Sequence, residues 1–461
     1  MLRYNLASNG TFNARGGKLN KTNASLALLI LVSLMLGPMY STLGASINLY
    51  YSSFVGLALF IIILKTRLQT KPKETLTSYF YIYYFFSMLI SAAVIEGGAL
   101  MFEIGEKGSY NGTFWTILFY FLIGLVSISF GFSLHNKAST GPILKAKYSI
   151  KAERLVVVIF LIAAFSFSAL IAYRYSSPIL LGVERFTFWN NIVPPALQIA
   201  KSLITQAFYF IPALMIVISR KWRKKMAILT AATWIIITLF VLGEKFTAFQ
   251  YYLTIAAFYF SALGNHSTKL KIPYKTILTI ATILISILAY ANNATGYTIE
   301  FIYNRIALQS QLTWSVIQHN LEVSSILSGA FELTSAVLPS DRFDRYVDAG
   351  VSLTGFFPAV QIASLGHTLS SALHILVFIS AGFIQAEILK LLNRKCIIQS
   401  FLLFKLYISL IFFWLALDSA QLYNGVNFIC LSLLIAGTIM NRFNRNQFTQ
   451  PSLTQASSIE R

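Results

Sequence analysis

A series of long apolar runs limits this chain more than any other feature of its sequence, because each run is nearly free of charged side chains. A helix needs about 20 mostly apolar residues to cross the hydrocarbon core of a bilayer. Charged residues make up only 11% of the chain, against roughly 25% in soluble domains, which excludes a soluble enzyme or a disordered chain. The sequence therefore predicts an all-α polytopic integral membrane protein with about twelve transmembrane helices, at 24–40, 47–64, 76–95, 114–134, 155–173, 202–219, 226–242, 248–263, 276–291, 370–390, 397–417 and 425–440.

The distribution of Lys and Arg predicts the orientation. With both ends of the chain in the cytoplasm, the cytoplasmic segments hold 27 Lys and Arg and the outer segments hold 8. Short cytoplasmic loops normally carry this excess, so the net charge of +20 needs no nucleic-acid partner. The prediction is a cytoplasmic segment at 1–23, a transmembrane domain at 24–440 and a polar, disordered cytoplasmic tail at 441–461.

One pair of runs is open to two interpretations. Runs 226–242 and 248–263 are short, and only residues 243–247 separate them. Because proteins keep ionisable groups out of hydrocarbon, a tight turn at the membrane surface is predicted here, with a re-entrant hairpin as the alternative.

Motifs for metal and cofactor binding are missing. The two cysteines show no metal-ligand spacing. The sequence has no Walker loop, no dinucleotide fingerprint, no H-E-x-x-H and no G-x-S-x-G. No metal and no cofactor are therefore predicted.

Two predicted outer loops, at 174–201 and 292–369, are long enough to suggest function, although a cap or an oligomer contact is the alternative. In the first loop, Glu184 and Arg185 precede Phe186 and Trp189. An arginine in an aromatic-lined pocket binds phosphate through its planar donor fork. A local pair with Glu184, or a lipid headgroup contact, explains Arg185 equally well.

The second loop holds two charged parts. In the first part, 300–319, a helix would place Arg305 one turn before Gln309, where both can grip a phosphate or a sugar. An amphipathic helix lying on the membrane, with Arg305 facing headgroups, is the alternative.

The second charged part is 341–348, in which two Arg and three Asp among eight residues offer both a pyrophosphate clamp and a general base. Ion pairs along an exposed helix would explain the same pattern. His367 is the best placed imidazole, with His319 and His374 as alternatives. The clamp and base candidates are Asp341, Arg342, Asp344 and Arg345.

The predicted architecture, together with the runs GEKF at 243–246 and RIALQSQLTW at 305–314, resembles the bacterial O-antigen polymerases. The resemblance implies a GT-C-like fold in the bacterial inner membrane. It also implies transfer of a glycan from undecaprenyl pyrophosphate to another lipid-linked repeat unit in the periplasm. Membrane lipids and a chain-length regulator protein are the further partners expected.

Family arginines in the two large loops are expected to hold the glycan or its pyrophosphate. By loop position they correspond to Arg185 and Arg305, and then to Arg342 and Arg345. Gln309 and His367 complete the expected substrate-binding set. The acids expected to accept the hydroxyl proton are Glu184, Asp341 and Asp344.

Three other function classes stay open. An O-antigen ligase shares the architecture and relies on a histidine in its large outer loop. A lipid-linked oligosaccharide flippase or other transporter has a similar number of spans, but the 78-residue loop argues against it. A scaffold protein is the most distant class, because no soluble partner-binding domain is visible in the sequence.

Overall fold

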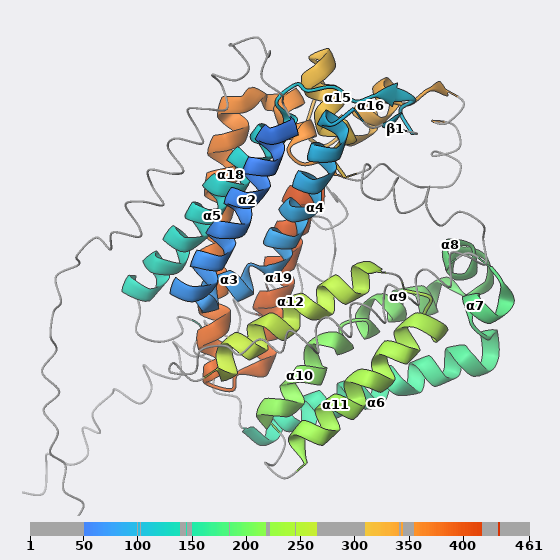
Figure 1. Ribbon diagram of the computed structural model, residues 1–461. Helices are drawn as coiled ribbons and strands as arrows, with labels where there is room; N and C mark the ends of the chain where they lie inside the picture. The colour runs from blue at the N-terminus through green and yellow to red at the C-terminus, as the bar shows by residue number, and fades with distance from the viewer. Residues whose placement is uncertain are drawn as a thin grey trace, which may run out of the picture. The chain divides into compact units, whose positions relative to one another are not determined.

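Figure 1 shows the protein as a computed structural model. The structure describes residues 50–98, 100–101, 103–138, 144, 150–183, 185–217, 222–244, 246–264, 309–340, 343, 355–416 and 432–433. All of them belong to one compact unit of the chain, Leu49–Arg461.

The described elements are almost entirely helical. The first part of the chain contains α2 (Tyr50–Thr70), α3 (Pro72–Thr77), α4 (Tyr79–Glu96), strands β1 (Leu100–Met101) and β2 (Glu106–Lys107), and α5 (Thr113–Ala138). The middle contains α6 (Ile150–Tyr175), α7 (Pro178–Leu181), α8 (Arg185–Thr187), the π-helix η1 (Phe188–Ile192), α9 (Pro195–Ile204), α10 (Ala207–Val217), α11 (Arg223–Ile236), the π-helix η2 (Ile237–Val241) and α12 (Phe246–Leu263). The last part contains α15 (Gln311–His319), α16 (Gly329–Val337), α18 (Ala359–Asn393) and α19 (Ile397–Ala416).

Seven helices within the described parts are long and apolar enough to cross a membrane: Tyr79–Glu96, Thr113–Ala138, Lys151–Leu181, Pro195–Val217, Arg223–Val241, Ala359–Asn393 and Ile397–Leu415. They coincide with seven of the predicted runs, so the chain is an all-α, multi-pass membrane protein. Of the other runs, 24–40 and 276–291 lie outside the described residues, and 425–440 is described only at 432–433. Runs 47–64 and 248–263 fall on α2 and α12, which are not among the seven.

Helices α5 and α18 lie side by side (Figure 1), and glycines bring their backbones together. A Cβ atom added to Gly131 would lie 1.9 Å from the carbonyl oxygen of Ile379. A Cβ atom added to Gly382 would lie 2.0 Å from the carbonyl oxygen of Ile128. Membrane helices that pack this closely need small residues at the contact, because dispersion forces rather than the hydrophobic effect hold them together in lipid.

Residues of two predicted cytoplasmic segments, 65–75 and 135–154, contact neighbouring helices. Arg67, near the end of α2, donates a hydrogen bond to Ser129 Oγ of α5 at 2.5 Å. Glu153, at the start of α6, accepts one from the backbone N–H of Ile398, at the start of α19, at 3.0 Å. The first contact joins α2 to α5, and the second joins α6 to α19.

The opposite ends of α4 and α5 contact α15. The indole N–H of Trp314 donates to the Ser109 carbonyl oxygen at 2.7 Å, and Ser310 Oγ donates to the Met88 carbonyl oxygen at 2.5 Å. The antiparallel hairpin β1–β2, which sequence periodicity did not predict, packs on Trp314 through Met101. Strands of two residues carry too little alternation to be recognised in a sequence.

One predicted boundary is corrected by the structure. The 174–201 loop is largely helical, because Pro178 and Pro195 each begin a new helix where a missing N–H costs nothing. The predicted tenth span, 370–390, lies in the second of two helical pieces of α18, which meet at a kink at Gly366 with φ 69°. A left-handed glycine lets two helical pieces join at an angle, which the apolar run alone does not reveal.

Candidate functional site

One carboxylate and two cations form the candidate site. Arg185 Nη1 lies 2.6 Å from Glu244 Oε2, and Lys201 Nζ lies 2.6 Å from Glu244 Oε1. The side chains are partly accessible, with exposed fractions of 23% for Arg185, 18% for Lys201 and 14% for Glu244. We call these three residues the Glu244 cluster. It has a net charge of +1.

Trp189 holds the cluster in place. Lys201 Nζ lies 4.5 Å from the centroid of the Trp189 ring, a cation–π contact. The indole N–H donates to the carbonyl oxygen of Leu242 at 3.0 Å, which ties η1 to the end of η2. Gln198 of α9 donates to the carbonyl oxygens of Trp189 and Val193. Single π-helical turns are frequent at functional sites, and two of them flank this cluster.

The turn at Gly243 explains why Glu244 reaches Arg185. Gly243 has φ 62°, which glycine adopts at little cost. A Cβ atom there would lie 2.5 Å from Pro178 Cγ, so only glycine lets the turn approach α7. The backbone N–H of Glu244 donates to the Thr238 carbonyl oxygen at 2.9 Å and fixes the direction of the chain.

The chemistry that this arrangement allows is anion binding beside a proton acceptor. A guanidinium and an ammonium together neutralise a phosphate or pyrophosphate, with the guanidinium as a two-pronged donor. A carboxylate at hydrogen-bonding distance from both can accept the proton of an attacking hydroxyl.

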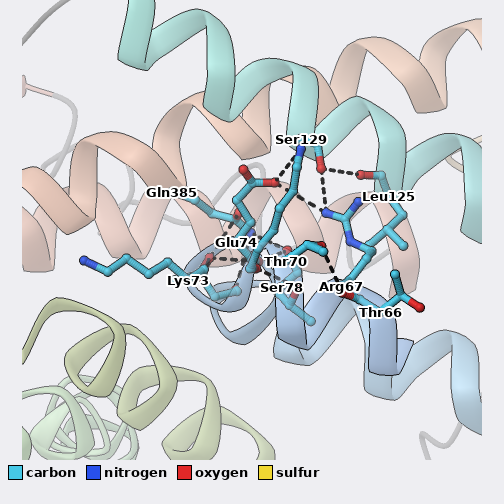
Figure 2. A network of polar contacts seen from close by, with 12 residues as sticks. Thr66, Arg67, Thr70, Lys73, Glu74, Ser78, Leu125, Ser129 and Gln385 are labelled. Carbon is cyan, nitrogen blue, oxygen red and sulfur yellow. Dashed lines mark hydrogen bonds and ion pairs between the residues drawn. The ribbon is translucent and has the colours of Figure 1, made fainter. Parts of the chain in front are cut away.

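A second cluster has the same charge pattern but is closed (Figure 2). Glu74 of α3 lies 3.5 Å from Arg67 Nη2 and 3.5 Å from Lys71 Nζ. The Arg67 side chain is only 7% exposed and donates to Ser129, as Figure 2 shows. Because its arginine is buried between helices, this cluster is a structural tie between α2, α3 and α5.

A third cluster joins the ends of α5 and α18. His135 Nε2 lies 2.6 Å from Glu387 Oε2, and Lys390 Nζ lies 2.8 Å from His135 Nδ1. Glu387 also accepts the backbone N–H of Leu144 at 2.8 Å. The carboxylate thus fixes the segment that follows α5 as well as the imidazole.

Of the residues predicted from sequence, Arg185, Gln309 and His367 are described, and they occupy three different elements. Arg185 belongs to the Glu244 cluster. Gln309 lies in the turn before α15, so the described helix begins two residues after it. His367 is exposed on α18, immediately after Gly366. The other predicted site residues lie outside the described residues: Glu184, Arg305, Asp341, Arg342, Asp344 and Arg345.

The aromatic side chains near the predicted sites serve packing. Trp189, Trp314, Phe356 and Phe357 are all buried, so none presents a face on which a sugar can stack. Phe357 instead stacks on His374, with ring centroids 4.8 Å apart.

Sequence reasoning did not find Lys201 and Glu244 as partners of Arg185. Lys201 was assigned to the end of a loop, and Glu244 to a surface turn. One feature of the sequence pointed to Glu244: it follows a glycine between two apolar runs. An acid so close to hydrocarbon needs a cationic partner.

Among the residues that the structure describes, no group of three or more His, Cys, Asp or Glu is arranged to hold a metal ion. Residues 324–431 match a family of unknown function (DUF6418). The matched segment takes in α16, α18 and α19 and does not include the Glu244 cluster. No curated protein and no solved structure matches the chain.

Proposed function

We propose that this protein is a glycosyltransferase of the O-antigen polymerase type, which joins lipid-linked oligosaccharide repeat units. The donor is a glycan on undecaprenyl pyrophosphate, and the acceptor is a sugar hydroxyl of another lipid-linked unit. The reaction takes place on the periplasmic face of the bacterial inner membrane, in a GT-C-like fold of twelve spans with both ends in the cytoplasm. A chain-length regulator is the protein partner, and no metal or cofactor takes part.

The observation that supports the proposal is the Glu244 cluster. The leaving group of this reaction is a pyrophosphate, whose growing negative charge needs positive groups in a water-poor site. Arg185 and Lys201 supply two such groups within reach of one carboxylate. Lys201 belongs to the apolar stretch Pro195–Val217, and Arg185 and Glu244 closely follow two others, Lys151–Leu181 and Arg223–Val241. Helices of this kind can face lipid, the surroundings that a polyprenyl chain needs.

A deletion strain tests the proposal against its rivals. Its lipopolysaccharide, separated on a gel, should carry a single repeat unit on the core. Core without any repeat would instead favour the ligase or the flippase. The exposed side chains of His319 and His367 keep the ligase as the second candidate.

Complementation of that strain tests the site. Arg185→Lys keeps the charge but loses the planar fork, so polymerisation should fall roughly ten- to hundredfold while the protein still inserts. Arg174→Lys is the matched control, because Arg174 is exposed in the last turn of α6. Equal polymerisation by the two variants would show that Arg185 does not bind the substrate.

A further inference from the structure

We propose that Glu244 and the donor pyrophosphate compete for Arg185 and Lys201, and that Glu244, once displaced, accepts the proton of the attacking hydroxyl. This inference rests on the proposed glycosyl transfer. It adds a mechanism in which binding of the donor activates the base.

The first step of the argument is that both oxygens of Glu244 are engaged. Oε2 lies 2.6 Å from Arg185 and Oε1 lies 2.6 Å from Lys201. A carboxylate whose two oxygens each accept a charge-assisted hydrogen bond is a geometric substitute for two oxygens of a phosphate. Arg185 and Lys201 keep further N–H donors, but Glu244 already cancels one of their two positive charges. A pyrophosphate held by the same cations lies beside this carboxylate, and repulsion between the two anions favours its release.

The second step is that the site keeps its shape when Glu244 moves. Lys201 retains its contact with the Trp189 ring, and Trp189 is held by Leu242 and Gln198. With its backbone held by the bond to the Thr238 carbonyl oxygen, Glu244 can release the two cations by rotation of its side chain alone.

The third step is the chemistry. The hydroxyl oxygen of the acceptor forms a bond to the anomeric carbon of the donor glycan. The bond from that carbon to the pyrophosphate oxygen breaks, and its electron pair stays on the pyrophosphate, which Arg185 and Lys201 hold. The hydroxyl proton moves to the freed Glu244 carboxylate, so atoms and charges balance.

The test measures binding of inorganic pyrophosphate, without metal, to the purified full-length protein in detergent by calorimetry. Glu244→Gln should bind roughly ten- to hundredfold more tightly than the wild type, because the competing charge is gone. Arg185→Gln should bind at least about tenfold more weakly. Glu244→Asp keeps the charge on a side chain one methylene shorter, so its affinity should lie between those of the wild type and Glu244→Gln.

The matched control is Glu74→Gln. Glu74 has the same exposed fraction as Glu244, 14%, and the same kind of partners, but its arginine is enclosed by α5. The affinity of the Glu74→Gln protein for pyrophosphate should equal that of the wild type. An equal gain in Glu74→Gln, or no gain in Glu244→Gln, would overturn the competition. If Glu244→Gln does not fold, unchanged binding in Arg185→Gln would overturn it as well.

The second measurement is polymerisation of lipid-linked repeat units by the same proteins. Glu244→Gln should lose about a hundredfold or more of its turnover in spite of its tighter binding. Tighter binding with normal turnover would overturn the role as base. If the variants change pyrophosphate binding as expected but the wild type makes no polymer, the proposed function is contradicted. The competition between Glu244 and pyrophosphate would still stand.

Discussion

The buried imidazole of His135 connects Glu387 to Lys390. Lysine nitrogen only donates, so Nδ1, at 2.8 Å from Lys390 Nζ, accepts. The proton of the neutral ring is then on Nε2, which donates to Glu387 at 2.6 Å. His319 and Glu106 form the same kind of pair at 3.0 Å, but both side chains are 43% exposed.

This contrast predicts different costs for removing the two imidazoles. His135→Ala removes the hydrogen bond that the buried imidazole donates to Glu387 and should lower the free energy of unfolding by about 1–3 kcal/mol. His319→Ala should lower it by about 0–1 kcal/mol, because an exposed pair contributes little. Denaturant unfolding in detergent measures both, and equal losses would show that burial does not strengthen the first pair.

Gly243→Ala should destabilise the turn of the Glu244 cluster. The left-handed backbone costs about 1–2 kcal/mol for alanine, and the contact with Pro178 adds about 1–3 kcal/mol of overpacking. Gly182→Ala is the control, since Gly182 has φ 64° and nothing within 4 Å of an added Cβ atom. The difference between the two losses of unfolding free energy measures the contribution of the contact with Pro178. Equal losses in the two variants would show that this contact contributes nothing.

Glu332 should make the 324–332 segment dependent on pH. The hydroxyls of Ser324 and Ser328, and then the backbone N–H of Ser324, hold the pKa of this carboxyl below its usual value. Since the folded pKa is the lower one, the stabilisation is present above the unfolded pKa of about 4.3 and is lost as pH falls through the folded value.

Hydrogen exchange measures this effect at the Ser324 amide, which donates to Glu332 at 2.8 Å. Its protection, corrected for intrinsic exchange, should fall at acid pH in the wild type. Glu332→Gln should show no such transition. Protection that is unchanged by acid would contradict the role of the carboxylate.

Reporter fusions test the orientation. A fusion at Arg223, where α11 begins, should report cytoplasm, because five Lys and Arg lie in 220–225. A fusion at Asp344 should report the periplasm. Fusions that report the same side would exclude the twelve-span arrangement with both ends inside.

Sequence alone was sufficient for the seven helices, among the described residues, that are long and apolar enough to cross a membrane. The run at 114–134, for example, is found within α5, Thr113–Ala138. Burial in lipid selects apolar residues one by one along the chain and requires every backbone group to bond within its helix, so composition over about 20 residues is enough. Arg185 was also recognised as a candidate by its local setting.

Tertiary structure alone decided which charges meet. Arg185 and Glu244 are 59 positions apart, and no local pattern joins them. Their contact depends on the turn at Gly243, the approach to Pro178 and the bond from Trp189 to Leu242. Hydrophobic periodicity predicts which face of a helix is buried, but not which helix packs against it. Helix packing depends on shape and on small residues such as Gly131 and Gly382.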